Sequence, residues 1–414
     1  MWLYGAAGAG KSAIAHTLAE ICVNNGWLVA SFFFWKTSGD RNNAKRFVAT
    51  IAYQFALAIP QLRELIEAAI DYNPFIFQQS VHVQLSKLII EPLQQLCSVG
   101  ILSNISPLVI IIDGLDECQG AGIQSTLIKS LAAAFHDVPF RIRILIASRP
   151  EVYLRASFNS SSVQSRLARL ALSGEYSPDE DIYQFLKDSF NKIRCEHPLA
   201  SYLPCLWPPA HVLRELTRKS SGQFIFASTT VKYVGGDPHQ LPHRRLDVVR
   251  RLQPPKGEKD MPHAELNSLY HHVLTNVDNT KAMKQILGVL IILNPLAMFK
   301  NHWDGVDSPR RIDNFFFWQP GETEACLSQL ASIVEFGTHR KKISILHASL
   351  SEFLLDPSRS RQFYISRESI LGDYAALGLC HLNLQAVPGN GASFTLFQKF
   401  IVGMLTSSTS YLSF

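Results

Sequence analysis

The chain has 414 residues, of which 47% are apolar and 18% are charged. This composition can bury sizeable cores, so it excludes a disordered or fibrous chain, and the length predicts two to three domains at about 150 residues each. The net charge of +5 is mild for this length and does not favour a nucleic-acid partner, which needs Lys and Arg clustered on one face.

Residues 1–155 alternate short apolar runs with longer amphipathic stretches. Residues 2–4, 27–35, 107–112 and 142–147 predict β-strands, and residues 12–24, 47–59, 61–70 and 123–135 predict helices. The runs 107–112 and 142–147 are continuously apolar, which is typical of strands buried on both faces. Strands that alternate with helices predict a parallel sheet with helical crossovers.

From about residue 175 the pattern becomes mainly helical. The segments 182–193, 212–219 and 224–234 carry apolar residues at helical spacing. A third block covers residues 264–359, and within it residues 301–320 read as irregular. No internal repeat is evident.

Residues 5–12, GAAGAGKS, match the phosphate-binding pattern G-x-x-x-x-G-K-[ST] at every fixed position. Small residues let backbone N–H groups surround a phosphate, and the following helix directs its positive N-terminus at the same anion. Lys11 is expected to reach the β- and γ-phosphate oxygens, and the Ser12 hydroxyl to ligate Mg²⁺. A glycine-rich turn could match by chance, but this one follows a strand and opens a helix. The predicted nucleotide-binding residues here are Gly5, Gly8, Gly10, Lys11, Ser12 and Ala13.

Residues 109–117, VIIIDGLDE, form a buried strand that ends in carboxylates. A parallel strand delivers its last residue to the edge of the sheet where ligands bind. We expect Asp113 to hold Mg²⁺, with Ser12 as the other metal-binding side chain, and Asp116 or Glu117 to orient a hydrolytic water. The alternative is that these acids are ordinary turn and cap residues.

Arg149 follows the second buried strand, in the segment LIASRPE. A guanidinium at this edge can read a γ-phosphate, or it can form a structural ion pair. The sequence alone leaves both interpretations open.

These three motifs, in this order, resemble the NACHT domains of signal-transduction NTPases with numerous domains (STAND), of the nephrocystin-3-like N-terminal type and specifically the large fungal group. The segments TIAYQF at 50–55, IEPL at 90–93, SGQFIFA at 221–227 and LHASLSEF at 346–353 add to the resemblance. It covers roughly residues 2–365. The phosphate loop is shared by many NTPases, whereas the DGLDE strand with the later segments narrows the family.

The resemblance implies an α/β fold in which a P-loop NTPase parallel sheet is sandwiched by helices and followed by a helical domain and a winged-helix-like domain. The expected ranges are 1–160 for the NTPase core, 161–255 for the small helical domain, 260–365 for the winged-helix-like domain and 366–414 for a C-terminal helical remnant. It implies an ADP-bound resting state and an ATP-bound signalling state, with slow Mg²⁺-dependent hydrolysis, domain opening and self-association. Arg149 would sense phosphate and His347 would contact the ADP β-phosphate, although a histidine packed in the core is the alternative for His347.

The chain departs from the family pattern at both ends. Only residues 2–4 precede Gly5 as a strand, whereas strands typically have about 5–6 residues, and relatives carry an upstream effector and a downstream repeat domain. We therefore expect a fragment or a truncated gene model that binds nucleotide poorly by itself.

Two other functions remain open, an interaction scaffold whose NTPase core is decayed and a phosphotransferase that uses the same phosphate loop. Seven scattered cysteines without a C-x-x-C pair fit neither a disulfide scaffold nor a zinc ribbon and favour a cytoplasmic location. The longest apolar run has about eight residues, fewer than the roughly 18 of a membrane span, so no membrane partner is expected.

Overall fold

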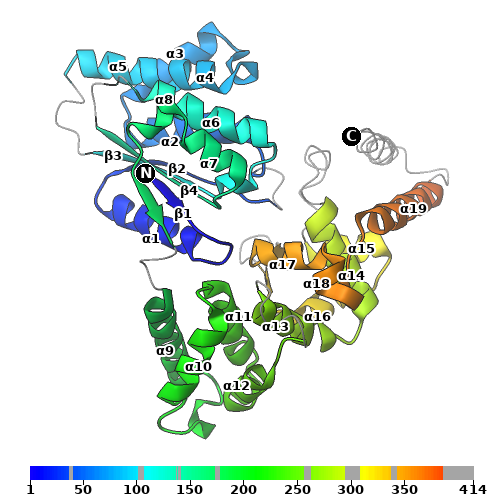
Figure 1. Ribbon diagram of the computed structural model, residues 1–414. Coiled ribbons are helices and arrows are strands. Elements are labelled where there is room, and N and C mark those ends of the chain that lie inside the picture. Colours follow the sequence, from blue (N-terminus) through cyan, green and yellow to red (C-terminus); the bar gives the residue numbers. More distant parts are fainter. Residues whose placement is uncertain are drawn as a thin grey trace. The chain divides into compact units, whose positions relative to one another are not determined.

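The computed structural model describes residues 1–36, 41–100, 107–136, 138, 141–172, 178–255, 263–293, 308–336 and 343–385. The chain forms two compact units, Met1–Pro178 and Asp179–Phe414 (Figure 1). Each unit has its own apolar core.

The first unit is built on a five-stranded sheet with the order β2-β3-β4-β1-β5. Every neighbouring pair of strands in it is parallel. The predicted parallel sheet is therefore confirmed, and the carboxyl ends of all its strands lie at one edge. The strands are β1 (Trp2–Tyr4), β2 (Leu28–Phe33), β3 (Leu108–Asp113), β4 (Ile142–Ser148) and β5 (Arg169–Ala171).

Helices cover both faces of this sheet, as expected for an α/β sandwich (Figure 1). Along β3, Ile110 and Ile112 pack into a large core with α2, α6 and α7, whereas Ile111 packs into a small core with Ala15 of α1. This alternation follows from the period of two in a β-strand. The helices of the first unit are α1 (Lys11–Asn24), α2 (Phe47–Ala58), α3 (Leu62–Tyr72), α4 (Val81–Leu85), α5 (Glu91–Ser98), α6 (Ala121–Ala134), α7 (Val152–Phe158) and α8 (Ser161–Gln164).

The three-residue strand β1 is an interior strand, paired with β4 on one side and β5 on the other. Trp2 and Leu3 are both buried, and the indole N–H of Trp2 donates to the Ser148 hydroxyl at 2.9 Å. Because β5 belongs to the sheet, the sheet extends beyond residue 160, where the sequence analysis places the end of the first domain.

The second unit is mainly helical. The predicted apolar stripe of 182–193 is confirmed, since Ile182, Leu186 and Phe190 are fully buried on α9. A two-stranded antiparallel sheet joins β6 (Val334–Phe336) and β7 (Ile343–Ile345). The helices are α9 (Pro178–Glu196), α10 (Ala210–Ser220), α11 (Phe224–Gly235), α12 (Pro242–Arg251), α13 (Ala264–Thr275), α14 (Thr280–Gly288), α15 (Pro309–Phe316), α16 (Glu322–Ser328), α17 (Ala348–Leu354), α18 (Pro357–Ser360) and α19 (Arg367–Gln385).

One prediction for this unit is corrected. The segment 301–320 is not irregular throughout, because α15 occupies Pro309–Phe316 and buries Ile312, Phe315 and Phe316. Residues 301–307 and 386–414 lie outside the described part of the chain. Among the described residues, no helix combines the length and the apolar character needed to cross a membrane.

Candidate functional site

The phosphate loop, residues 5–12, connects β1 to α1 at the carboxyl edge of the sheet. Gly8 and Gly10 have φ angles of 76° and 88°, in the left-handed region that glycine adopts without a Cβ clash. The Lys11 ammonium folds back on the loop and donates to the carbonyls of Gly5 at 2.9 Å and Ala6 at 2.8 Å. Burial lowers the pKa of Lys11, while the charge of Asp116 opposes that shift.

Asp113 is the last residue of β3 and is almost fully buried. Burial raises the pKa of its carboxyl, and a hydrogen bond from the Ser12 side chain opposes that shift. Asp113 Oδ1 is buried without a hydrogen-bond partner among the described residues. An orphaned buried carboxylate oxygen next to a serine hydroxyl fits a hard cation such as Mg²⁺, which takes oxygen ligands.

The turn after β3 carries the other two acids of the acid cluster, which we define as Asp113, Asp116 and Glu117. The turn begins at Gly114, whose φ is +68° and whose missing Cβ would lie 3.0 Å from the Phe34 carbonyl oxygen. A short 3₁₀ turn, Leu115–Glu117, follows it. Only glycine allows both the positive φ of Gly114 and its close approach to the Phe34 carbonyl without strain, so the packing of this turn against the end of β2 depends on Gly114.

Asp116 is paired with Arg149 through both of its carboxylate oxygens. Oδ1 accepts the Arg149 backbone N–H at 2.9 Å, and Oδ2 lies 3.2 Å from Nε of the guanidinium. The Asp116 side chain is 8% exposed and that of Arg149 is 22% exposed. The pair joins the turn after β3 to the residue that follows β4, its neighbour in the sheet.

Glu117 is held differently. Its Oε2 accepts the backbone N–H of Lys36, just beyond β2, at 2.8 Å. Burial raises the pKa of Glu117 to about 7, and the Lys36 hydrogen bond opposes the shift. A carboxyl that titrates near neutral pH is suited to accept a proton from water.

The structure therefore brings together the phosphate loop, the acid cluster and Arg149 at one edge of the sheet. The charges of Asp113, Asp116, Glu117 and Arg149 all act on the Lys11 ammonium. His347 lies in the second unit, where it caps α17: its Nδ1 accepts the Ser349 backbone N–H at 3.1 Å. A contact between His347 and a nucleotide stays a prediction.

Two supporting groups were not predicted. The backbone N–H of Lys36 could not be predicted, because every residue except proline carries such a donor and the residue type does not indicate it. Gln124 of α6 is buried and donates from its amide to the carbonyls of Asp116 and Cys118, which fixes the acidic turn. An amide at the fourth residue of a helix that follows an acidic turn was the only available signal.

The described residues contain no group of three or more His, Cys, Asp or Glu side chains arranged to hold a metal ion. A magnesium site of the kind predicted needs fewer protein ligands, because Mg²⁺ keeps several waters and binds substrate phosphates. Ser12 and Asp113 are the side chains that could hold it.

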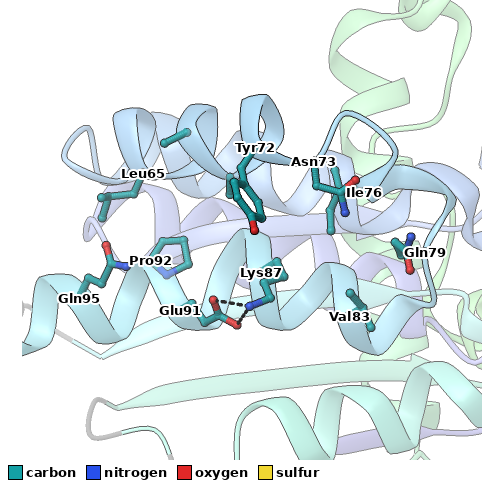
Figure 2. A pocket seen from close by; sticks show the side chains of 12 residues that line it. Leu65, Tyr72, Asn73, Ile76, Gln79, Val83, Lys87, Glu91, Pro92 and Gln95 are labelled. Atoms are coloured by element: carbon teal, nitrogen blue, oxygen red, sulfur yellow. Dashed lines mark hydrogen bonds and ion pairs between the residues drawn. The ribbon is translucent and has the colours of Figure 1, made fainter.

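A groove of about 490 Å³ lies elsewhere in the first unit, between α3 and the run from α4 to α5. Figure 2 shows Tyr72 above the Lys87–Glu91 ion pair, with Leu65, Ile76 and other residues around it. None of the groove residues belongs to the phosphate loop or the acid cluster. The groove is therefore separate from the candidate site.

One comparison with known proteins concerns the first unit alone. Residues 1–149 match the family described as Nephrocystin 3, N-terminal. No curated protein matches the chain. A Walker-type ATPase of Pyrococcus abyssi is 14% identical with a TM-score of 0.28, over 83% of this chain and 94% of that one. A chain in the structure of Drosophila ORC bound to DNA is 11% identical with a TM-score of 0.35, over 89% and 91%. Both TM-scores are too low for a shared overall fold to be inferred.

Proposed function

We propose that this chain binds ATP or ADP with Mg²⁺ at the phosphate loop and hydrolyses ATP slowly, as a nucleotide-dependent switch. One observation carries the proposal: Lys11 and Ser12 meet the acid cluster at the carboxyl edge of a parallel sheet. A glycine-rich loop before a helix supplies N–H groups for phosphate, and the carboxylates beside it supply a ligand for a cation and a base for water.

The residues divide the chemistry between them. Ser12 and Asp113 would hold Mg²⁺, which when bound neutralises charge on the phosphate oxygens. Lys11 would exchange its carbonyl contacts for phosphate oxygens. Glu117 would orient the attacking water and take its proton, because its carboxyl is not committed to an arginine as that of Asp116 is.

The finer assignment is a NACHT switch of the STAND class, in which nucleotide state controls domain opening and self-association. The match to the nephrocystin 3 N-terminal family over residues 1–149 supports it, together with the motifs of the sequence. The antiparallel pair β6–β7 beside α17 is compatible with a winged-helix-like domain.

A thermal-shift experiment on the full chain tests nucleotide binding. Ligand at 100 times its Kd adds about 2.7 kcal/mol of stability, which corresponds to roughly 5–11 °C for a unit of this size. Lys11→Ala should abolish the shift with Mg²⁺-ATP. Lys129→Ala, which removes an exposed lysine from α6, should keep the shift of the parent protein.

Other outcomes identify the alternatives. A parent protein that shows no shift with either nucleotide would contradict the proposal and favour an interaction scaffold. Rapid transfer of the γ-phosphate to an added acceptor, rather than slow release of phosphate, would favour a phosphotransferase.

A further inference from the structure

The pairing of Asp116 with Arg149 uses both oxygens of the carboxylate. Both oxygens of the carboxylate are taken by one residue, one by its backbone N–H and the other by its guanidinium. The two donors differ in whether they can leave the carboxylate. The backbone bond is fixed by the end of β4, whereas the guanidinium is on a flexible side chain and can move to another anion.

The position of Asp116 is also fixed independently of Arg149. Gln124 donates to the Asp116 carbonyl at 3.3 Å, and the backbone N–H of Arg149 holds Oδ1. A departing guanidinium would therefore leave the carboxylate in place. The Arg149 charge acts on Lys11 and Glu117, so the guanidinium lies within the phosphate-binding cluster rather than on a remote surface.

We propose that Asp116 is a positioning residue that holds the Arg149 guanidinium in competition with the γ-phosphate, and so sets how strongly the site prefers a nucleoside triphosphate over a diphosphate. The inference rests on the proposed function. A diphosphate leaves the Asp116–Arg149 pair intact, whereas a triphosphate has to draw the guanidinium away from Oδ2. Each triphosphate therefore loses part of the gain from its new contact.

The quantity that tests the proposal is the ratio of two affinities, measured by titration calorimetry on the full chain with Mg²⁺. The probes are ADP and the non-hydrolysable β,γ-imido analogue of ATP. Asp116→Asn keeps an oxygen for the Arg149 backbone N–H and removes the charge that holds the guanidinium. The preference for the triphosphate should rise about five- to tenfold.

Two further variants separate this effect from a general change in charge. At pH 8, above the Glu117 pKa of about 7, Glu117→Gln removes nearly the same charge from the same cluster without touching the pair, and should change the ratio less. Arg149→Gln should collapse the ratio, and adding Asp116→Asn to Arg149→Gln should change nothing further, because the effect passes through the guanidinium. If Asp116→Asn does not fold, Asp116→Ala serves in its place, since it also removes the charge that holds the guanidinium.

The results distinguish the two levels of the argument. Two results would refute the competition between Asp116 and the γ-phosphate while leaving the proposed function intact, provided that the parent binds nucleotide. In the first, Asp116→Asn changes the affinity ratio no more than Glu117→Gln does. In the second, Asp116→Asn changes the ratio by the same factor in the Arg149→Gln background as in the parent. If the parent binds neither nucleotide, and Lys11→Ala behaves like the parent, the proposed function and the competition are both wrong.

Discussion

Glu117→Gln should make the first unit more stable at pH 8 while it abolishes hydrolysis. In the folded protein the pKa of Glu117 is raised from its ordinary 4.5 to about 7, mainly by burial. The folded state thus holds the proton more tightly than the unfolded state. Stability from this group is complete below about pH 4.5 and is lost as pH rises through 7. Glutamine has no proton to lose and keeps an acceptor for the Lys36 N–H.

The expected size follows from the shift. A shift of this size corresponds to about 3 kcal/mol at 1.36 kcal/mol per pKa unit, and because the side chain is only half-buried, solvent screening reduces it to about 2–3 kcal/mol. The melting temperature of the variant relative to the parent should therefore rise by roughly 4–12 °C more at pH 8 than at pH 5.

Differential scanning calorimetry of the full chain, without nucleotide, measures this difference. Glu64→Gln, which neutralises an exposed carboxylate on α3, should show no such change with pH. The same Glu117→Gln protein should bind Mg²⁺-ATP and release no phosphate. If the stability gain of the variant over the parent does not increase from pH 5 to pH 8, Glu117 is not a base with a raised pKa, and the assignment of its role fails.

Three further substitutions test other parts of the structure. Gly114→Ala places a Cβ 3.0 Å from the Phe34 carbonyl at a positive φ and should destabilise the first unit by about 1–3 kcal/mol; an unchanged calorimetric melt would contradict this. Gln54→Leu removes the amide that bonds both the N–H and the carbonyl of Ser31 on edge strand β2. The backbone groups of the edge strand are then free to pair with another chain, so light scattering should show concentration-dependent association. A monodisperse variant would refute an edge-protecting role for Gln54. Asp313→Ala orphans two backbone N–H donors that the buried carboxylate binds at 2.8 Å each; urea unfolding should show a loss of about 2–4 kcal/mol, and a loss below 1 kcal/mol would refute it.

The elements that sequence reasoning located are those whose composition allows a single solution. The run that became β3 has no polar residue before Asp113, so only burial on both faces accommodates it. Strand β5 was missed because it has three residues at the edge of the sheet and begins with an exposed arginine. Helix α15 has only eight residues, so the helical spacing of Ile312, Phe315 and Phe316 did not stand out from the polar and aromatic residues around it.

The candidate site divides in the same way. Its residue types and their common edge follow from the sequence, because a phosphate loop and a strand ending in acids meet only at the carboxyl ends of parallel strands. The hydrogen-bond and ion-pair partners of the acids cannot be predicted from the sequence. Asp116 and Arg149 are 33 residues apart, and Glu117 and the Lys36 N–H are 81 apart. Such pairings depend on the order of strands and on a backbone donor that no residue type indicates, so the sequence could not separate the roles of Asp116 and Glu117.

Both cations of the site are bound to oxygen atoms of the protein, and this bears on how a switch could work. Lys11 lies on the carbonyls of Gly5 and Ala6, and Arg149 lies on Asp116. On our proposal a diphosphate replaces only the first set of contacts, whereas a triphosphate replaces both. Each replacement exchanges one charge-assisted contact for another, so the net gain is smaller than the new contacts alone would give. A single phosphate group can then exchange two states that differ by a few kcal/mol, and the Asp116–Arg149 pair sets how large the difference between the two nucleotides is.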